Sequence, residues 1–265
     1  LWSKTSYHMQ ALRDNAECAA QEFAAIAQPN PGLSSHLTFD PSDNIAAPFI
    51  ATGVRPKVAI LREQGVNSQN EMAAVFLRAG FRAVDVHMSD LASGRDSLAN
   101  YQGLVACGGF SYGDHMTSGH VFALRVKHHM QAQLQKFIDD GKLIMGICNG
   151  FQVLTQLGLL PNANGVREVA LAENKQGRFL NCWVRLEVPV QASCFWLQGM
   201  TSLYLPIRHK EGRVVFSDPS VHQRLVDNGQ IVLRYQEAMN GSTDRIAGIC
   251  DPTGCILGLM PHPEA

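Results

Sequence analysis

The stretch LIMGICNGFQVLTQLG, residues 143–158, decides the fold, because a short apolar run passes directly into a helix-like run. The apolar run, KLIMGI at 142–147, is uninterrupted, which is typical of a strand buried on both faces of a parallel sheet. Before it, residues 120–141 are amphipathic and end at Gly141, so they predict a long helix. A buried strand between two helices predicts a doubly wound α/β sheet.

The same alternation continues upstream and changes downstream. Upstream, the strand-like and helix-like runs that predict βαβ units are VAIL (58–61), SQNEMAAVFLRAG (68–80), residues 83–87 and LVACGG (104–109). Downstream, the apolar runs separated by turns are FLNCWVRLEV (179–188), RVVF (213–216), IVLRYQ (231–236), RIAGICD (245–251) and CILGLMP (255–261). We therefore expect a mostly parallel sheet with a mixed or antiparallel extension on the same sheet.

The first 55 residues differ from the rest. One helix-like run over Met9–Ala27 passes into a stretch rich in Pro, Ser, Asn and Asp at 28–56, which predicts a connector. Such a segment has little core of its own, so we expect a chain cut from something longer. The expected division is a linker region at 1–55 and one domain at 56–265, truncated at its C-terminus.

Composition excludes several classes of protein. The 265 residues carry 22 Lys and Arg against 23 Asp and Glu, a net charge of -1, which disfavours nucleic acid and anionic membranes as partners. No apolar stretch is long enough to span a bilayer, and the first residues lack a secretion signal, so we expect a cytoplasmic protein. The seven cysteines are odd in number and widely spread, which argues against a disulfide framework.

Cys148 directly follows the predicted strand, with Gly146 and Gly150 two residues away on either side. A tight strand-to-helix turn with small neighbours is the setting of a nucleophile elbow, and the helix N-terminus would stabilise a thiolate. The alternative is a buried structural cysteine, the commoner fate of this residue type. The spacing favours a nucleophile.

A nucleophilic cysteine needs a base, and His262 and Glu264 stand two residues apart around Pro263. Proline holds the preceding residue extended, and in extended chain positions i and i+2 point to one side. His262 could then take the thiol proton while Glu264 orients the imidazole. The alternative is an ordinary exposed loop after the last strand.

A glycine-rich segment, VACGGFSYGDH at 105–115, also follows a predicted strand. Its glycines allow backbone N–H groups to point inward and form an oxyanion hole. One donor would come from Gly109 or Phe110, and the other from Asn149, the residue after the nucleophile. The alternative is a plain β-turn.

Three motifs, GGFSYGD (108–114), GICNGFQ (146–152) and PHPE (261–264), together resemble the triad class of glutamine amidotransferase domains. With LREQGVNSQNEMAAVFLRAGF (61–81), the chain looks like the glutaminase part of phosphoribosylformylglycinamidine synthases. The resemblance implies a flavodoxin-like fold of the class I amidotransferases. It also reaches upstream, where WSKTSYHMQALRDN (2–15) and LTFDPSDNIAAPFIATGVRPKVAILREQG (37–65) look like the end of the synthetase portion and the linker of the long, single-chain form, so it covers nearly the whole sequence.

For the site, the resemblance implies that Cys148 is the nucleophile, His262 its base and acid, and Glu264 the orienting carboxylate. It also implies that Gln152 holds the α-amino or carboxylate group of glutamine; the alternative is a simple polar surface residue. One departure from the family pattern is Lys210 in HKEGR, where the family has a glycine.

The implied activity is hydrolysis of glutamine through a cysteine thioester, which supplies ammonia for the ATP-dependent conversion of formylglycinamide ribonucleotide to its amidine in purine biosynthesis. The chain would be part of a carbon–nitrogen ligase whose synthetase portion, on this chain or a partner, binds ATP and Mg²⁺. No G-x-x-x-x-G-K-[ST] motif occurs here, so we expect no cofactor in this segment. The rivals are a cysteine hydrolase or peptidase of the same fold, and a catalytically silent regulatory domain.

The histidines invite a metal interpretation that their spacing does not support. His128 and His129 are adjacent and diverge on the predicted helix, and no Cys or carboxylate lies at a convincing ligand spacing from His115 or His120. We expect a solvated helix face and no metal.

Overall fold

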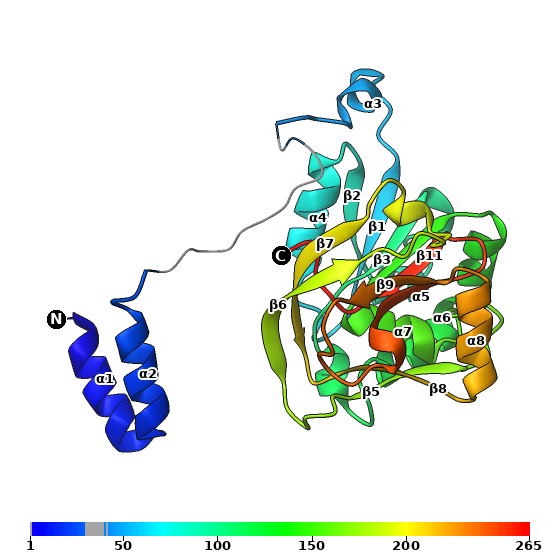
Figure 1. Cartoon of the computed structure of the whole chain (residues 1–265). Helices are drawn as coiled ribbons and strands as arrows, with labels where there is room; N and C mark the ends of the chain where they lie inside the picture. Colours follow the sequence, from blue (N-terminus) through cyan, green and yellow to red (C-terminus); the bar gives the residue numbers. More distant parts are fainter. Residues whose placement is uncertain (1, 30–39, 41) are drawn as a thin grey trace. The chain divides into compact units, whose positions relative to one another are not determined.

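The computed structural model describes residues 2–29, 40 and 42–265, which fall into two compact units, 1–40 and 41–265 (Figure 1). The helices are α1 (Trp2–Arg13), α2 (Ala16–Ala25), α3 (Ala47–Ala51), α4 (Gln69–Arg78), α5 (Met88–Ala92), α6 (His120–Asp139), α7 (Asn149–Gln156) and α8 (Pro219–Asp227). The strands are β1 (Lys57–Arg62), β2 (Arg82–His87), β3 (Gly103–Ala106), β4 (Leu143–Ile147), β5 (Val169–Glu173), β6 (Leu180–Glu187), β7 (Ser202–His209), β8 (Glu211–Phe216), β9 (Ile231–Tyr235), β10 (Ile246–Cys250) and β11 (Ile256–Leu259).

The first unit is a hairpin of two helices, α1 and α2. The single helix predicted over Met9–Ala27 is wrong, because the Asn15 side chain accepts the Cys18 N–H at 2.9 Å and starts a second helix there. The rings of Tyr7 and Phe23 stack across the hairpin, with centroids 4.6 Å apart. The predicted connector lies partly outside the described residues, which omit 30–39 and 41.

The second unit contains a nine-stranded sheet in the order β2-β1-β3-β4-β11-β10-β9-β6-β7 (Figure 1). The strands from β2 to β11 pair in parallel, and those from β11 to β7 pair antiparallel. The order β2-β1-β3-β4-β11 is the flavodoxin-like one. The predicted α/β fold, mostly parallel with an antiparallel extension, is confirmed.

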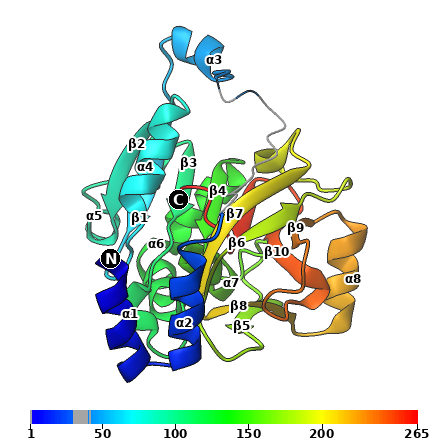
Figure 2. The ribbon, with the colours of Figure 1, turned by 60° about the vertical axis from the view of Figure 1, so that its left-hand side comes forward.

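Helices cover both faces of the parallel part. The crossover from β1 to β2 and that from β3 to β4 run in opposite directions along the sheet, so right-handed connections place α4 and α6 on opposite faces. Figure 2 shows α4 against β1 and β2, in agreement with its contacts to both strands. Helix α7 packs on the face of α6 and contacts β3, β4 and β11.

One predicted strand lies in a different sheet. The segment RVVF belongs to β8, which pairs antiparallel with β5 in a separate two-stranded sheet, and Val169 opposite Phe216 is one pair of the register. Its expected place on the main sheet is therefore wrong. Strands β5 and β7 and helix α8 had no counterpart in the sequence-based prediction.

The carboxyl ends of the parallel strands meet at one edge of the sheet. Glu63 follows β1, Gly108 and Gly109 follow β3, Cys148 follows β4, and His262 follows β11. Ligands bind at this edge in open α/β sheets, because the loops from several strands converge there. The fold thus brings all three sequence motifs to one place.

Among the described residues, no helix combines the length and the apolar character needed to cross a membrane.

Candidate active site

Cys148 lies on a strained turn between β4 and α7, with φ 51° and ψ −107°. Its N–H donates a hydrogen bond to the Leu259 carbonyl oxygen at 2.8 Å, which ties the turn to β11. A Cβ at Gly150 would collide with the Ala106 carbonyl oxygen, and one at Gly146 would come 2.7 Å from the Gly150 carbonyl oxygen. Both glycines are therefore required for the turn to pack this closely, as expected of a nucleophile elbow.

The thiol of Cys148 is buried, with 5% of the residue exposed, and it faces the antiparallel extension of the sheet. Its Sγ lies 3.7 Å from the Arg208 carbonyl oxygen at the end of β7. Cys148 is also the N-cap of α7, and the first intrahelical bond uses the Gln152 N–H. The earlier N–H groups of this helix, Asn149 among them, lie beside the sulfur, where a negative charge is stabilised.

His262 and Glu264 meet as the sequence predicts. The His262 Nδ1 atom lies 2.7 Å from the Glu264 Oε1 atom, and both residues are buried. The backbone N–H of His262 donates to the Pro206 carbonyl oxygen at 2.9 Å, so β7 fixes the backbone of His262. Burial alone lowers the pKa of His262, but the Cys148 sulfur and the Glu264 carboxylate outweigh it and raise the pKa to about 9. The imidazole is thus held as a cation at neutral pH.

The glycine-rich segment is clamped by the loop after β1. The Phe110 N–H donates to the Gly65 carbonyl oxygen at 2.8 Å, and Gly109 pairs with Val66 in an isolated antiparallel bridge. Gly109 has φ 140°, and a Cβ there would lie 2.5 Å from the Gly65 carbonyl oxygen. Gly109 and Phe110 were the two alternatives for one donor to the oxyanion. Because the Phe110 N–H already donates to Gly65, the Gly109 N–H is the remaining candidate.

Gln152 does not lie where the resemblance implies. Its side chain accepts from Asn149 Nδ2 at 2.9 Å and donates to the Glu211 carbonyl oxygen at 2.6 Å. The residue is 5% exposed, so both ends of its amide are used inside the protein. Gln152 therefore joins α7 to β8 and is not available to hold glutamine; its interpretation as an ordinary polar surface residue is wrong too.

A cavity of about 420 Å³ opens above the thiol. It is lined by Asn67, Ser68, Glu71, Gly109, Phe110, Cys148, Phe179, Arg208, His262, Glu264 and Ala265. The sequence-based prediction missed six of these, namely Asn67, Ser68, Glu71, Phe179, Arg208 and Ala265. The first three follow β1 and could have been found from that strand's carboxyl end, whereas nothing in the sequence indicates that the β6–β7 hairpin reaches this cavity. Glu71 and Arg208 add one acidic and one basic residue to the lining besides the triad.

The turn between β7 and β8 contains the departure from the family pattern. Lys210 points to Glu173, with Nζ 2.9 Å from Oε1, and does not line the cavity. His209 is buried and neutral, because burial and the nearby charge of His262 lower its pKa to about 4. A Cβ at Gly212 would collide with the His209 ring. The glycine that matters for packing in this turn is thus Gly212.

The histidines considered for a metal lie apart from this cavity. The Nδ1 atom of His120 lies 3.3 Å from Gln156 Oε1. The rings of His128 and His129 were expected to diverge, but their centroids lie 4.7 Å apart. In the part of the chain that the structure describes, no three His, Cys, Asp or Glu side chains are grouped to hold a metal ion.

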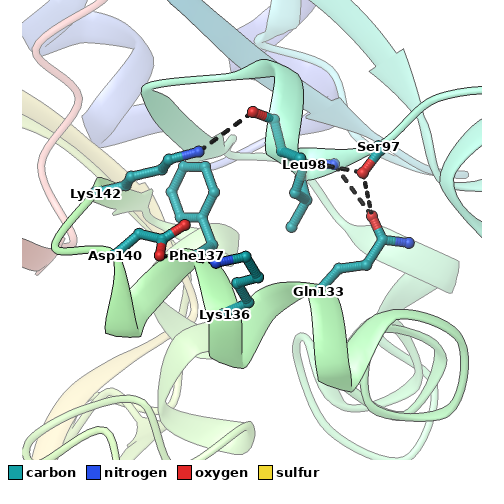
Figure 3. Close-up of a pocket in the computed structure, with 8 residues that line it drawn as sticks. Ser97, Leu98, Gln133, Lys136, Phe137, Asp140 and Lys142 are labelled. Carbon is teal, nitrogen blue, oxygen red and sulfur yellow. Dashed lines mark hydrogen bonds and ion pairs between the residues drawn. The ribbon is translucent and has the colours of Figure 1, made fainter.

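A second, smaller pocket of about 80 Å³ lies between α6 and the segment before β3 (Figure 3). Gln133 Oε1 accepts the Leu98 N–H there at 3.1 Å, and Lys142 Nζ donates to the Ala99 carbonyl oxygen at 3.4 Å. Its lining contains no cysteine or histidine and shares no residue with the cavity above Cys148. It is therefore separate from the candidate active site.

Comparisons with known proteins find a matching family and similar solved structures. Residues 55–265 match the CobB/CobQ-like glutamine amidotransferase domain. The solved structure of PurLQS from Thermotoga maritima is 33% identical, with a TM-score of 0.65, and the match covers 80% of this chain and 89% of that chain. A glutamine amidotransferase from Thermotoga maritima is similar in fold, with 16% identity, a TM-score of 0.50, and 80% and 77% of the two chains covered.

Proposed function

Because the chain belongs to the family of CobB/CobQ-like glutamine amidotransferase domains, we propose that it hydrolyses glutamine through a thioester on Cys148 and supplies ammonia to a synthetase. One observation carries the proposal. Cys148 and the hydrogen-bonded pair of His262 and Glu264 line a single cavity, with a helix N-terminus beside the sulfur. A nucleophile, a base and an orienting carboxylate in one cavity are the parts needed for acyl transfer.

The first half of the reaction forms the thioester. The Cys148 thiolate attacks the side-chain carboxamide carbon of glutamine, and the amide oxygen becomes an oxyanion. The N–H groups of Gly109 and Asn149 donate to this oxygen. His262, protonated at Nε2, then gives its proton to the leaving nitrogen; the C–N bond breaks and ammonia departs, leaving a γ-glutamyl thioester.

The second half releases glutamate. Neutral His262 takes a proton from water, and the hydroxide attacks the thioester carbon. The C–S bond breaks, and the Cys148 thiolate returns beside the imidazolium. Glu264 holds Nδ1 through both halves, so that Nε2 always faces the reacting atoms.

Glutamine binding needs partners for a carboxylate and an ammonium group. Arg208 and Glu71 line the cavity with opposite charges, and they take the roles that Gln152 cannot fill. A guanidinium binds a carboxylate through charge-assisted hydrogen bonds. Phe179 and Phe110, with ring centroids 6.4 Å apart, would cover the aliphatic part of the substrate.

The ammonia would be used by a synthetase that converts formylglycinamide ribonucleotide to its amidine in the cytoplasm. The similarity to PurLQS and the motif GGFSYGD support this acceptor. ATP and Mg²⁺ would bind to the synthetase portion, on this chain or a partner. The division into an end of that portion with its linker at 1–55 and a glutaminase at 56–265 is part of the proposal.

Glutamate release tests the proposal. Wild type and Cys148→Ala are compared with glutamine, an activated ester and a short peptide, alone and with the synthetase portion added. We expect turnover of glutamine that requires Cys148. Faster turnover of the ester or peptide would support the cysteine hydrolase, and no turnover with any substrate, even beside the synthetase portion, would support the silent domain.

A further inference from the structure

Asn149, the first residue of α7, is almost completely buried, with 1% of the residue exposed. Its side-chain Oδ1 atom accepts the Ser111 N–H at 3.2 Å. Its Nδ2 atom donates to Gln152 Oε1 at 2.9 Å and to Asp114 Oδ1 at 3.4 Å. Because none of these three partners lines the cavity, the polar atoms of the Asn149 side chain face the protein and not the substrate.

The turn at 111–114 is strained, and Asn149 binds it at both ends. Its backbone is left-handed at two residues with side chains, with φ of 55° at Tyr112 and 54° at Asp114. A strained turn persists only where its surroundings fix it. Asn149 accepts the N–H of Ser111 at the start of the turn and donates to the carboxylate of Asp114 at its end. The Asn149 side chain is therefore one of the restraints that hold this turn.

The glycine-rich segment is also held by the loop after β1. The Asn67 N–H donates to the Gly108 carbonyl oxygen at 3.3 Å, one residue before Gly109. One residue after Gly109, the backbone N–H donates to Gly65, as described above. The bonds from Asn149 connect the same segment to α7. The Asn149 side chain thus joins the segment that contains Gly109 to the helix beside the sulfur.

Gln152 fixes the orientation of the Asn149 amide. Its Oε1 atom accepts from Asn149, and its Nε2 atom donates to the Glu211 carbonyl oxygen at 2.6 Å. A reversed Asn149 amide would place two acceptor oxygens together at Gln152 and two N–H donors together at Ser111, so both contacts would be lost. The Asn149 oxygen is therefore kept toward the backbone of Ser111.

We propose that the side chain of Asn149 is a positioning group of the glutaminase reaction, which acts through Ser111 to set the distance between the two oxyanion donors. The inference rests on the proposed function, in which the donors are the N–H groups of Gly109 and Asn149. One donor belongs to the glycine-rich segment and the other to α7, and the Asn149 side chain binds that segment directly. Preorganised donors stabilise an oxyanion because they need not move as its charge develops.

The test compares Asn149→Ala and Asn149→Leu with wild type, each assayed with the synthetase portion present. Both variants keep the backbone N–H of residue 149 and remove the acceptor for Ser111. Misplacement of a catalytic group by about 1 Å costs about 100-fold in rate, so we expect kcat for glutamine hydrolysis to fall about 10- to 100-fold with little change in KM. Alkylation of Cys148 by iodoacetamide develops no oxyanion, so its rate should stay at the wild-type value.

Gln230→Leu is the matched control, because it removes another buried amide. Gln230 is 0% exposed and does not line the cavity. Its Nε2 atom donates to the Pro161 carbonyl oxygen at 2.8 Å and to the Cys250 carbonyl oxygen at 3.0 Å. We expect Gln230→Leu to lower the Tm, as Asn149→Leu does, while its kcat stays at the wild-type value.

If one Asn149 variant does not fold, the other decides. If neither folds, Gln152→Leu decides, because it frees the Asn149 amide to turn away from Ser111 and should lower kcat; a wild-type kcat there would overturn the inference. Unchanged kcat in the folded Asn149 variants, equal loss of hydrolysis and alkylation, or an equal loss of kcat in Gln230→Leu would also overturn it. Absence of hydrolysis by the wild type would instead overturn the proposed function.

Discussion

The Nδ1 atom of His262 lies 2.7 Å from the Oε1 atom of Glu264, although a proline separates the two residues in the chain. This bond commits one ring nitrogen to the carboxylate and leaves the other for the thiol. It also contributes to a His262 pKa of about 9, so that the ring is charged when the thiolate forms.

Replacing Glu264 by Gln should lower the pKa of His262 and the rate together. Activity that needs the imidazolium should persist in wild type up to about pH 9 and should be lost at lower pH in the variant. The rate at pH 7 should fall about 100-fold or more, as when general acid–base catalysis is lost. A pH–rate profile of both proteins checks this; superimposable alkaline limbs would contradict it.

The same shift predicts a pH-dependent stability. A pKa raised above the unfolded value of 6.5 stabilises the fold fully below pH 6.5, and the contribution disappears as the pH rises through 9. The Tm difference between wild type and Glu264→Gln should therefore be larger at pH 6 than at pH 10. Thermal unfolding at both pH values measures it, and a constant difference would contradict it.

Replacing Cys148 by Ala should abolish glutamine-dependent synthesis and leave synthesis from added ammonia, because only the nitrogen source is lost. Cys182→Ala, a change in β6 outside the cavity, is the control and should retain both activities. The assay measures amidine formation with each nitrogen donor at saturating ATP. Equal loss with both donors would contradict the separate roles.

Replacing Gly150 by Ala should disrupt the elbow, because the new Cβ would collide with the Ala106 carbonyl oxygen. Overpacking of this kind typically costs about 1–3 kcal/mol in free energy of unfolding, and turnover should fall with it. Gly177→Ala is the control: its φ of 64° makes Ala unfavourable by about 1 kcal/mol, but open space surrounds it. Urea unfolding and glutamate release compare the two, and equal effects would contradict the close approach.

Replacing Arg208 should change KM for glutamine, whereas replacing Gln152 should change the free energy of unfolding. Arg208→Gln removes the guanidinium proposed to bind the substrate carboxylate and should raise KM for glutamine about tenfold or more. Gln152→Leu leaves Asn149 and the Glu211 carbonyl oxygen without their partner, so it should lower the free energy of unfolding by about 1–3 kcal/mol while KM changes little. Steady-state kinetics and unfolding of each variant decide; a raised KM in Gln152→Leu alone would restore Gln152 as a substrate contact.

The local part of the fold was predictable because its signals are local. Apolar runs and helical periodicity gave the parallel strands, the geometry around Pro263 correctly predicted that His262 meets Glu264, and the resemblance to glutamine amidotransferase domains is confirmed. The position of β8 was predicted wrongly because its pattern of apolar and polar residues would be the same in either sheet. Whether it pairs with β5 or with the main sheet depends on tertiary contacts. The role of Gln152 could not be predicted for a related reason. Its hydrogen-bond partner, the Glu211 carbonyl oxygen, is 59 positions away in the sequence.

The last strand in the chain, β11, occupies the middle of the sheet between β4 and β10. During translation, β4 and β10 are synthesised before β11, so each has an unpaired edge until β11 is added. Such edges are sites for aggregation and for chaperones to bind. Pairing of β11 closes both edges, and the five residues that follow bring His262 and Glu264 to Cys148. The proposed base therefore reaches Cys148 in the same step that joins the two halves of the sheet, and a folding intermediate without β11 lacks the proposed catalytic triad.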